Sequence, residues 1–540
     1  MPDSKPHKPR AFNFSFVVFL IALLLFTIHY LKQLHNELQN RVAYPKLASE
    51  HNWLDFVARE FGDEKNITIG LVSMDQAAIT DEIDQTEMRV VKVHFDEVDK
   101  KVEWSHLFPD LIDRDLPSTC PKMPMPEFED YQPLDVVVAR VPCDGEGSGL
   151  RDVFRLQVNL VVANLLVRSG RSGNNGVQKP LFAVFVGSCG PMWEIFRCDD
   201  LLLHAGDSWI YKPELTRIRQ KLLMPVGSCQ LSPPFAQAGE ELWRRSKNYT
   251  IQQPKEAYVT VLHSSEAYVC GAISLAQSII QSNSTKDLVL LADSQISPKS
   301  IDGLRLAGWK IKKIQRIRSP HSKKNSYNEW NYSKLRIWQL REYSKVMFID
   351  SDLVVIKNLD KFFIYPQISA VRNDGPLFNS GLMLVEPSEC TFKALMKKRL
   401  VVESYNGGDQ GFLNQVFPWW HRLPSKINHL KFSRQVHDHA RKIPKDVRAV
   451  HYLGLKPWMC YRDYDCNWDK PETRQFASDA ANERWWRIYD AMPEKLRQYC
   501  SLTPEMNARI LRHREIAKNN GSFPDEHWKM EVKDPRRNVA

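Results

Sequence analysis

The fold of this chain is decided by the stretch Val346-Met347-Phe348-Ile349-Asp350-Ser351-Asp352. Four consecutive apolar residues are typical of a strand that is buried on both faces of a parallel sheet. Two carboxylates follow where such a strand leaves the sheet, which is the edge at which α/β proteins bind ligands. Carboxylate oxygens placed there can hold a hard divalent cation. The spacing alone means little, because Asp113 and Asp115 share it without a preceding apolar strand.

On either side of this stretch, strand patterns alternate with helix patterns. We expect strands at 257–262, 287–291, 309–314 and 345–349, and helices at 266–281, 301–307 and 333–343. Alternation of this length predicts a mostly parallel sheet covered by helices on both faces. The predicted fold class is therefore α/β.

A second α/β region precedes this one. We expect strands at 67–72, 89–95, 135–140 and 181–187, and a long helix at 150–168. A proline-containing stretch from Ser232 to Pro254 predicts a linker between the two regions. No motif in the first region can be assigned a chemistry, so its role stays open.

The N-terminus carries an apolar segment, 11–31, without any Asp, Glu, Lys or Arg. It is long enough to cross a bilayer core of about 30 Å. A cleaved signal peptide usually has a shorter apolar part that ends at a small-x-small site, which is absent here. Lys5, Lys8 and Arg10 precede the segment, so the positive-inside rule places the N-terminus in the cytosol. We expect a type II single-pass anchor with the remaining chain in a lumen.

The predicted division of the chain is as follows: cytosolic tail 1–10, transmembrane signal anchor 11–31, stem 32–65, N-terminal lumenal α/β region 66–245, second α/β domain 255–510 and charged C-terminal tail 511–540. The end of this tail, from about Lys518, is expected to be loosely ordered.

Composition and cysteine content restrict the class of protein. The chain has 74 basic and 64 acidic residues among 540 and is 43% hydrophobic, which excludes a wholly disordered chain. No basic run is interleaved with aromatic residues, so we expect no nucleic-acid partner. The ten cysteines form no CxxC pairs, which argues against a zinc site. In an oxidising lumen some should form disulfides, with Cys460 and Cys466 nearest in sequence, but the connectivity stays open. Sequons at Asn66, Asn248, Asn283, Asn331 and Asn520 agree with a secretory location.

Three polar motifs follow the paired carboxylates. Phe378-Asn379-Ser380-Gly381 precedes an apolar strand and can present an amide and backbone N–H groups. Asn406-Gly407-Gly408-Asp409-Gln410 combines flexible glycines with an acid and an amide before a helix. His451 offers a third metal ligand, and Lys456 a cation that can contact phosphate, with Gly454 allowing close backbone approach.

With these motifs in this order, residues 255–468 resemble the retaining, nucleotide-sugar-dependent glycosyltransferases of the glycogenin type, which have a GT-A fold. The resemblance implies that Asp350, Asp352 and His451 bind Mn²⁺, which holds the diphosphate of UDP. It implies sugar-contacting and catalytic positions at Asn379, Asp409 and Gln410. The remaining donor-contacting positions that it implies are Leu262, His263, Ser264, Tyr268, Lys334, Ser351, Ser380, Gly381, Asn406, Gly407, Gly408, Gly454, Leu455 and Lys456.

A narrower resemblance rests on other stretches. Tyr258-Val-Thr-Val-Leu-His-Ser-Ser-Glu-Ala-Tyr268, Trp419-Trp-His-Arg422 and Arg484-Trp-Trp-Arg487 are similar to the plant glucuronosyltransferases that decorate xylan. The similarity extends over roughly 67–510. It implies a Golgi membrane enzyme that transfers glucuronic acid from UDP-glucuronate to xylan with retention, and it leaves open an association with other Golgi enzymes of xylan synthesis.

Two residues bear on the charge of the transferred sugar. Glycogenins have an acid where this chain has Asn406, and a neutral amide there removes repulsion from a uronic acid. A sugar carboxylate favours a bidentate cation, for which Arg336 is our candidate.

Three alternatives stay open. A related enzyme could use a different donor or acceptor, because the motifs indicate UDP more clearly than the sugar. A transferase-like Golgi scaffold without activity would need no intact metal ligands. A xylan-binding lectin would need no diphosphate site.

Overall fold

The computed structural model describes residues 53–62, 66–75, 88–110, 119–143, 149–170, 180–234, 255–432, 442–520 and 526–538. The predicted cytosolic tail and membrane anchor, and most of the stem, lie outside these residues. Among the helices that are described, none has both the length and the apolar character needed to cross a membrane.

The N-terminal region contains a six-stranded sheet. Its strands lie in the order β2 (Met88–Val93), β1 (Ile67–Val72), β3 (Val136–Arg140), β4 (Phe182–Val186), β6 (Ser208–Tyr211) and β5 (Leu201–Ala205). The first four are parallel and confirm the predicted strands, whereas the antiparallel hairpin β5–β6 was not predicted.

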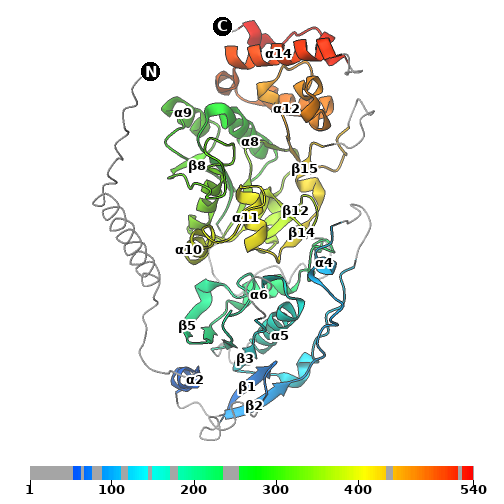
Figure 1. Ribbon diagram of the computed structural model, residues 1–540. Coiled ribbons are helices and arrows are strands. Elements are labelled where there is room, and N and C mark those ends of the chain that lie inside the picture. Colours follow the sequence, from blue (N-terminus) through cyan, green and yellow to red (C-terminus); the bar gives the residue numbers. More distant parts are fainter. Residues whose placement is uncertain are drawn as a thin grey trace, which may run out of the picture.

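Helices cover both faces of this sheet (Figure 1). Alternate residues of β3 explain why: Val136 and Val138 pack with α2 (Trp53–Phe61), while Val137 and Ala139 pack with α5 (Val153–Ser169). This alternation is the two-residue period of a strand. The helix α6 (Leu215–Leu222) lies beside α5.

The second region is built on a seven-stranded sheet. The strand order is β14 (His421–Leu423), β12 (Ser369–Arg372), β13 (Phe378–Val385), β10 (Lys345–Ile349), β7 (Glu256–Leu262), β8 (Asp287–Ala292) and β9 (Lys310–Lys313). Only β13 runs antiparallel to its neighbours, so the sheet is mixed and mostly parallel, as predicted. Its main helices are α8 (Val269–Gln281), α9 (Pro298–Leu306), α10 (Glu389–Lys398) and α11 (Asp409–Val416).

Two predictions for this half were inaccurate. The helix expected over 333–343 is a 3₁₀ helix, η6 (Asn331–Gln339). The C-terminal segment is also more ordered than its charge suggested. After α12 (Asp479–Ala491), α13 (Glu494–Arg497) and α14 (Pro504–Asn520), the buried Arg536 pairs with Asp534 and donates to the carbonyl oxygens of Trp458 and Cys500. This one buried ion pair anchors the end of the chain, although most other charged side chains of the segment are exposed.

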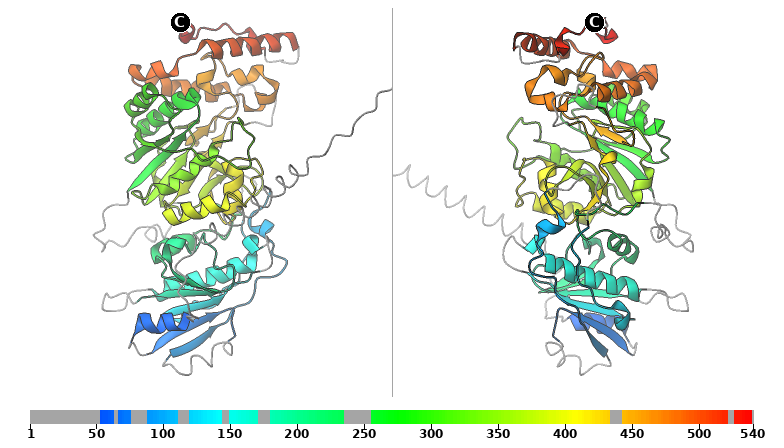
Figure 2. Two further views of the ribbon diagram at one scale, coloured as in Figure 1. Left: turned by 60° about the vertical axis from the view of Figure 1, so that its left-hand side comes forward. Right: turned by 90° about the vertical axis from the view of Figure 1, so that its right-hand side faces the viewer.

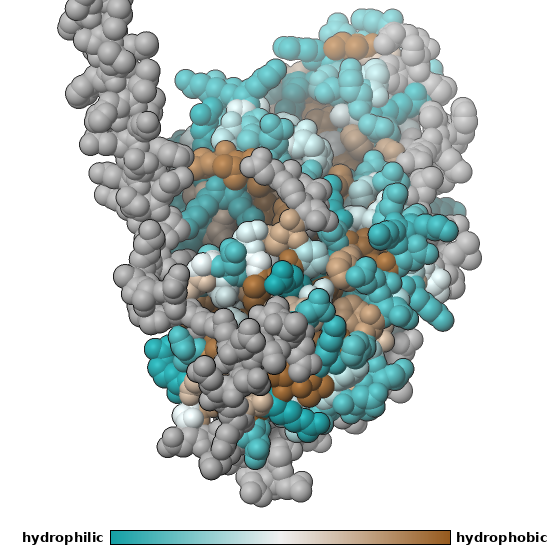
Figure 3. Space-filling model, turned by 60° about the horizontal axis from the view of Figure 1, so that its bottom comes forward, coloured by the Kyte–Doolittle hydropathy of each residue, from teal (hydrophilic) through white to brown (hydrophobic). Residues whose placement is uncertain are grey.

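The two regions share one hydrophobic core, which joins α5 to the segment around Trp419 and Trp420. Figure 2 shows α5 between the lower sheet and the upper region. All ten cysteines are paired; the disulfides are Cys120–Cys229, Cys143–Cys189, Cys198–Cys390, Cys270–Cys500 and Cys460–Cys466. The third of these links the regions covalently. The surface seen in Figure 3 is mostly hydrophilic, and its hydrophobic residues lie in small separate groups.

Candidate functional site

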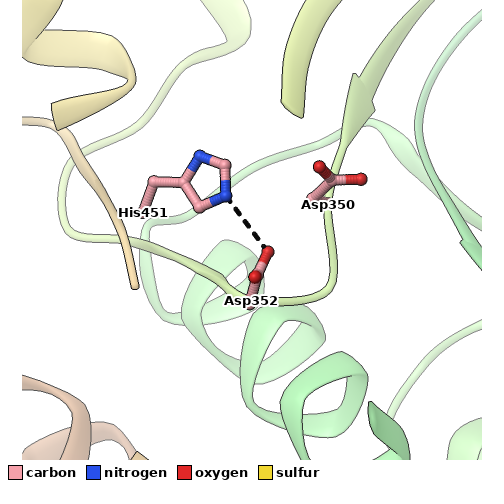
Figure 4. A group of neighbouring side chains, drawn as sticks. All are labelled: Asp350, Asp352 and His451. Carbon is pink, nitrogen blue, oxygen red and sulfur yellow. Dashed lines mark ion pairs between the residues drawn. The ribbon is translucent and has the colours of Figure 1, made fainter. Parts of the chain in front are cut away.

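The paired carboxylates and His451 come together through two strand pairings. Asp350 follows β10 directly, and its backbone N–H donates to the Gly381 carbonyl of β13 at 2.8 Å. In the small sheet, β11 (Leu353–Val355) pairs antiparallel with β16 (Ala449–His451), so that Leu353 lies opposite His451. One ligand atom from each of Asp350, Asp352 and His451 lies within 4.8 Å of the others, and the three side chains face one another (Figure 4).

Two lysines neutralise this acidic group. Lys456 Nζ lies 2.6 Å from Asp352 Oδ2, and Lys334 Nζ lies 3.4 Å from Asp350 Oδ1. Burial opposes the charge of Asp352, but Lys456 and His451 outweigh it and hold the pKa of this carboxyl well below its usual range. Desolvation, by contrast, raises the pKa of Asp350. Asp352 therefore stays ionised. The ionised form of Asp350 is less well compensated, so an additional cation would stabilise it more.

The donor set fits a divalent metal. Two carboxylates and one imidazole suit cations such as Mn²⁺ that accept oxygen and nitrogen ligands. His451 Nδ1 lies 3.2 Å from Asn428 Oδ1, and Asn428 Nδ2 donates to Asn379 Oδ1 at 2.9 Å. With its proton on Nδ1, the imidazole would present Nε2 to a metal, because second-shell hydrogen bonds of this kind fix the ring. Asn428 was not predicted, because nothing in its sequence neighbourhood distinguishes it.

A cavity of about 330 Å³ lies against these residues. The predicted site residues that line it are His263, Lys334, Asp350, Asn379, Ser380, Gly381, Asn406, Gly408, Asp409, Gln410 and His451. Polar lining residues that the sequence analysis missed are Tyr327, Asn328, Asn331 and Asn373. Asn331 and Lys334 both face the cavity because side chains three residues apart lie on one side of a 3₁₀ helix. The cavity thus combines one buried lysine with several amides.

Other predicted residues lie outside the cavity lining: Leu262, Ser264, Tyr268, Arg336, Ser351, Asp352, Gly407, Gly454, Leu455 and Lys456. Several of them still adjoin it. Asp352 contacts His451 at 3.3 Å, and the Tyr268 ring lies 5.9 Å from Lys456 Nζ. Gly454 has φ +74°, and a Cβ there would lie 2.3 Å from Asn467 Oδ1, so only glycine fits the turn that leads to Lys456.

The structure does not support Arg336 as a ligand for a sugar carboxylate. Its guanidinium donates to the Gln315 carbonyl at 3.2 Å and to Gln339 Oε1 at 2.8 Å, and it lies over the Phe392 ring. Arg336 follows Lys334 by two residues, and side chains two residues apart lie on different sides of a 3₁₀ helix. The Arg336 side chain therefore points away from the cavity that Lys334 lines. Among the described residues that line the cavity, Lys334 is the only lysine and none is an arginine.

The N-terminus of α11 presents Asp409 and Gln410. Asp409 Oδ2 lies 2.6 Å from Lys334 Nζ and accepts a hydrogen bond from Ser380 Oγ at 2.8 Å. Gln410 Oε1 accepts from the Ser380 backbone at 3.2 Å. Asn406 Oδ1 accepts from the backbone N–H groups of Gly408 and Gly411, at 2.9 and 3.2 Å. The side chain of Asn406 therefore holds the turn before α11 as well as lining the cavity.

Comparisons with known proteins agree with this geometry. The model of the GUX1-5 N-terminal domain matches residues 44–229, and that of glycosyl transferase family 8 matches 259–367. The chain is 47% identical over 499 residues to the UDP-glucuronate:xylan alpha-glucuronosyltransferase 2 of Arabidopsis thaliana, covering 89% of this chain and 82% of that protein. It is 52% identical over 507 residues to the Arabidopsis thaliana protein named "Putative UDP-glucuronate:xylan alpha-glucuronosyltransferase 4", covering 91% of this chain and 90% of that protein. It is 30% identical to human glycogenin-1 over 258 residues, covering 43% of this chain and 71% of that protein.

Proposed function

This chain belongs to glycosyltransferase family 8, among the plant UDP-glucuronate:xylan alpha-glucuronosyltransferases, and from this premise we propose that it transfers glucuronic acid from UDP-glucuronate to xylose residues of xylan. The resemblance stated from the sequence is thereby confirmed, and the seven-stranded sheet is a GT-A-like fold. The observation that carries the proposal is the cavity beside Asp350, Asp352 and His451, whose lining also includes Asp409 and Gln410.

Each group has a place in the proposed reaction. The diphosphate of UDP would lie against the Asp350-Ser351-Asp352 turn, within reach of Lys456. A divalent cation held by Asp350, Asp352 and His451, which we propose to be Mn²⁺, would neutralise charge on the leaving diphosphate. Lys334 pairs with Asp409, and the Ser380 backbone donates a hydrogen bond to Gln410. The side chains of Asp409 and Gln410 would thereby be fixed toward the transferred sugar.

Family 8 enzymes retain the configuration of the donor. We propose front-face attack: the bond between the sugar and UDP breaks, and a xylose hydroxyl forms the new bond on the same face. The hydroxyl proton passes to the departing diphosphate. Asp409 would stabilise the positive charge that develops on the sugar, since its carboxylate lies in the cavity and is fixed by Lys334.

The uronate of the donor would be bound mainly by neutral groups. Amides of Asn328, Asn331, Asn373 and Asn406 line the cavity and can donate hydrogen bonds to a carboxylate. The charge of Lys334 is already paired with Asp350 and Asp409, so the proposal assigns the hydrogen bonds to the uronate to these amides.

We also propose the Golgi membrane as the location, with the catalytic domain in the lumen. Five disulfides support an oxidising compartment, and the apolar segment 11–31 supports the anchor. Association with other Golgi enzymes of xylan synthesis belongs to the same proposal.

Donor competition tests the function. The full chain in detergent would receive xylohexaose, Mn²⁺ and equal amounts of UDP-glucuronate, UDP-glucose and UDP-galactose, with mass spectrometry of the oligosaccharide. We expect a product heavier by one uronic acid, absent after chelation and from Asp352→Asn but formed by the exposed control Asp302→Asn. A hexose product would identify a different donor. Binding of UDP without any transfer would favour the scaffold, and absence of UDP binding the lectin.

A further inference from the structure

Two exposed tyrosines lie at the mouth of the cavity. Tyr327 lines the cavity and yet is 84% exposed, which makes it the most exposed of the large hydrophobic side chains in the described part of the chain. Tyr405 is 53% exposed, and its hydroxyl accepts a hydrogen bond from Gln410 Nε2 at 3.1 Å. Both rings therefore lie between the cavity and open solvent.

The two loops that carry these tyrosines are held to one another. Asn328, next to Tyr327, donates from Nδ2 to the carbonyl of Asn406, next to Tyr405, at 2.6 Å. Ser319 Oγ donates to the Gly407 carbonyl at 2.7 Å, which joins the same loops a second time. The rings are thus presented by fixed backbone, so that little conformational entropy is lost when a ligand binds to them.

Neither ring belongs to the hydrophobic core clusters of the described residues. An exposed tyrosine on a backbone held in this way combines an apolar face with a polar tip, which is the composition typical of binding surfaces. Tyr327 is itself a lining residue and Tyr405 contacts the lining residue Gln410, so the two rings adjoin the donor site and do not form a separate patch.

A chain of β-linked xylose matches this surface. Xylopyranose has no hydroxymethyl group, so both faces of the ring expose C–H groups that can stack on an aromatic ring, while its hydroxyls lie at the rim. An acceptor that reaches Asp409 and Gln410 from solvent must pass the mouth of the cavity. We propose that Tyr327 and Tyr405 form a subsite that stacks xylose residues of the acceptor next to the residue that reacts; the identity of this ligand rests on the proposed function.

Truncation of Tyr327 tests the subsite. Tyr327→Ala should raise the KM for xylohexaose by about threefold or more, the value of one aromatic stacking contact. Tyr327→Phe should stay near wild type, and Leu511→Ala, an exposed truncation on α14, should leave the KM unchanged. The dissociation constant of UDP should be the same in all four proteins. An unchanged KM in Tyr327→Ala, or an equal weakening of UDP binding, would overturn the subsite.

Direct binding separates this inference from the proposed reaction. Titration of the full chain with unsubstituted xylohexaose in the presence of UDP needs no turnover. Weaker binding to Tyr327→Ala and Tyr405→Ala, with the wild-type melting temperature retained, supports the subsite even if no glucuronic acid is transferred. Normal transfer with equal binding by all variants rejects the subsite alone, and a wild type that does not bind xylohexaose rejects it as well.

Discussion

Replacing Trp193 by alanine should impair catalysis although this residue lies outside the transferase sheet. Its ring stacks on Phe417 with centroids 4.6 Å apart and planes 9° apart, and its Nε1 donates to the carbonyl of Val416, the last residue of α11, at 3.1 Å. Phe417 stacks in turn on Trp338 of η6 at 5.8 Å. These three rings connect the N-terminal region to both elements that supply the Lys334–Asp409 pair.

The magnitude follows from what the substitution removes. A fully buried tryptophan costs about 3–5 kcal/mol when it is truncated to alanine. Trp193 is half-buried, and its stack and its hydrogen bond each contribute about 1 kcal/mol. The substitution also removes the contribution of the apolar surface that Trp193 partly buries. In total we expect a loss of about 2–3 kcal/mol in the free energy of unfolding. Trp193→Phe keeps a ring on Phe417 and should lose only about 1 kcal/mol.

The assay pairs urea unfolding with kcat, measured where every variant is folded. Trp209→Ala is the matched control, because Trp209 is also half-buried and stacks on His204 and donates to the Gly187 carbonyl, all within the N-terminal region. Both alanine variants should lose stability, but only Trp193→Ala should lose kcat. An equal loss of kcat in both variants, or no loss of stability in Trp193→Ala, would refute the conclusion that Trp193 supports α11.

Three further outcomes are expected. Asp352→Ala should abolish transfer at any Mn²⁺ concentration, as read by mass spectrometry of the product; substantial remaining activity would reject the metal site. Asn406→Asp keeps the oxygen that caps the turn before α11 but adds a charge, so transfer from UDP-glucuronate should fall relative to UDP-glucose in the competition assay, with unchanged melting temperature; an unaltered ratio would contradict the charge argument. Burial opposes the charge of Glu386, but Lys345 and Arg197 outweigh it and lower its pKa to about 2. The depressed pKa stabilises the fold by about 3 kcal/mol above about pH 4.5, and this contribution is lost as the pH falls toward 2. The free energy of unfolding of Glu386→Gln, measured against pH, should not show this loss.

The strands and the acidic turn could be predicted because their signals are local. The apolar run before Asp350 has the length and composition of a buried strand, and β1 and β10 have the predicted bounds. His451 was predicted as a third metal ligand from the order of the motifs and from the resemblance, and the structure brings it close to both aspartates. Its approach to Asp352 depends on the pairing of β11 with β16, which are separated by almost a hundred residues in sequence.

The remaining features depend on tertiary contacts. Arg336 is held away from the cavity by the Gln315 carbonyl and the Phe392 ring, which are contacts that apolar periodicity does not reveal. Arg536 in the charged C-terminus is buried because carbonyl oxygens far away in sequence receive its donors. The stack of Trp193 on Phe417 likewise joins residues that no local pattern relates.

Transfer of glucuronic acid to xylose with retention is tested most directly by the linkage of the product. The full chain would convert UDP-glucuronate and xylohexaose in the presence of Mn²⁺, and NMR of the purified oligosaccharide would read the anomeric configuration of the added sugar. We predict a single glucuronic acid in α linkage to a xylose residue, absent when Asp352→Asn replaces the wild type. A β-linked product, or no uronic acid on xylohexaose despite bound UDP-glucuronate, would contradict the proposed function.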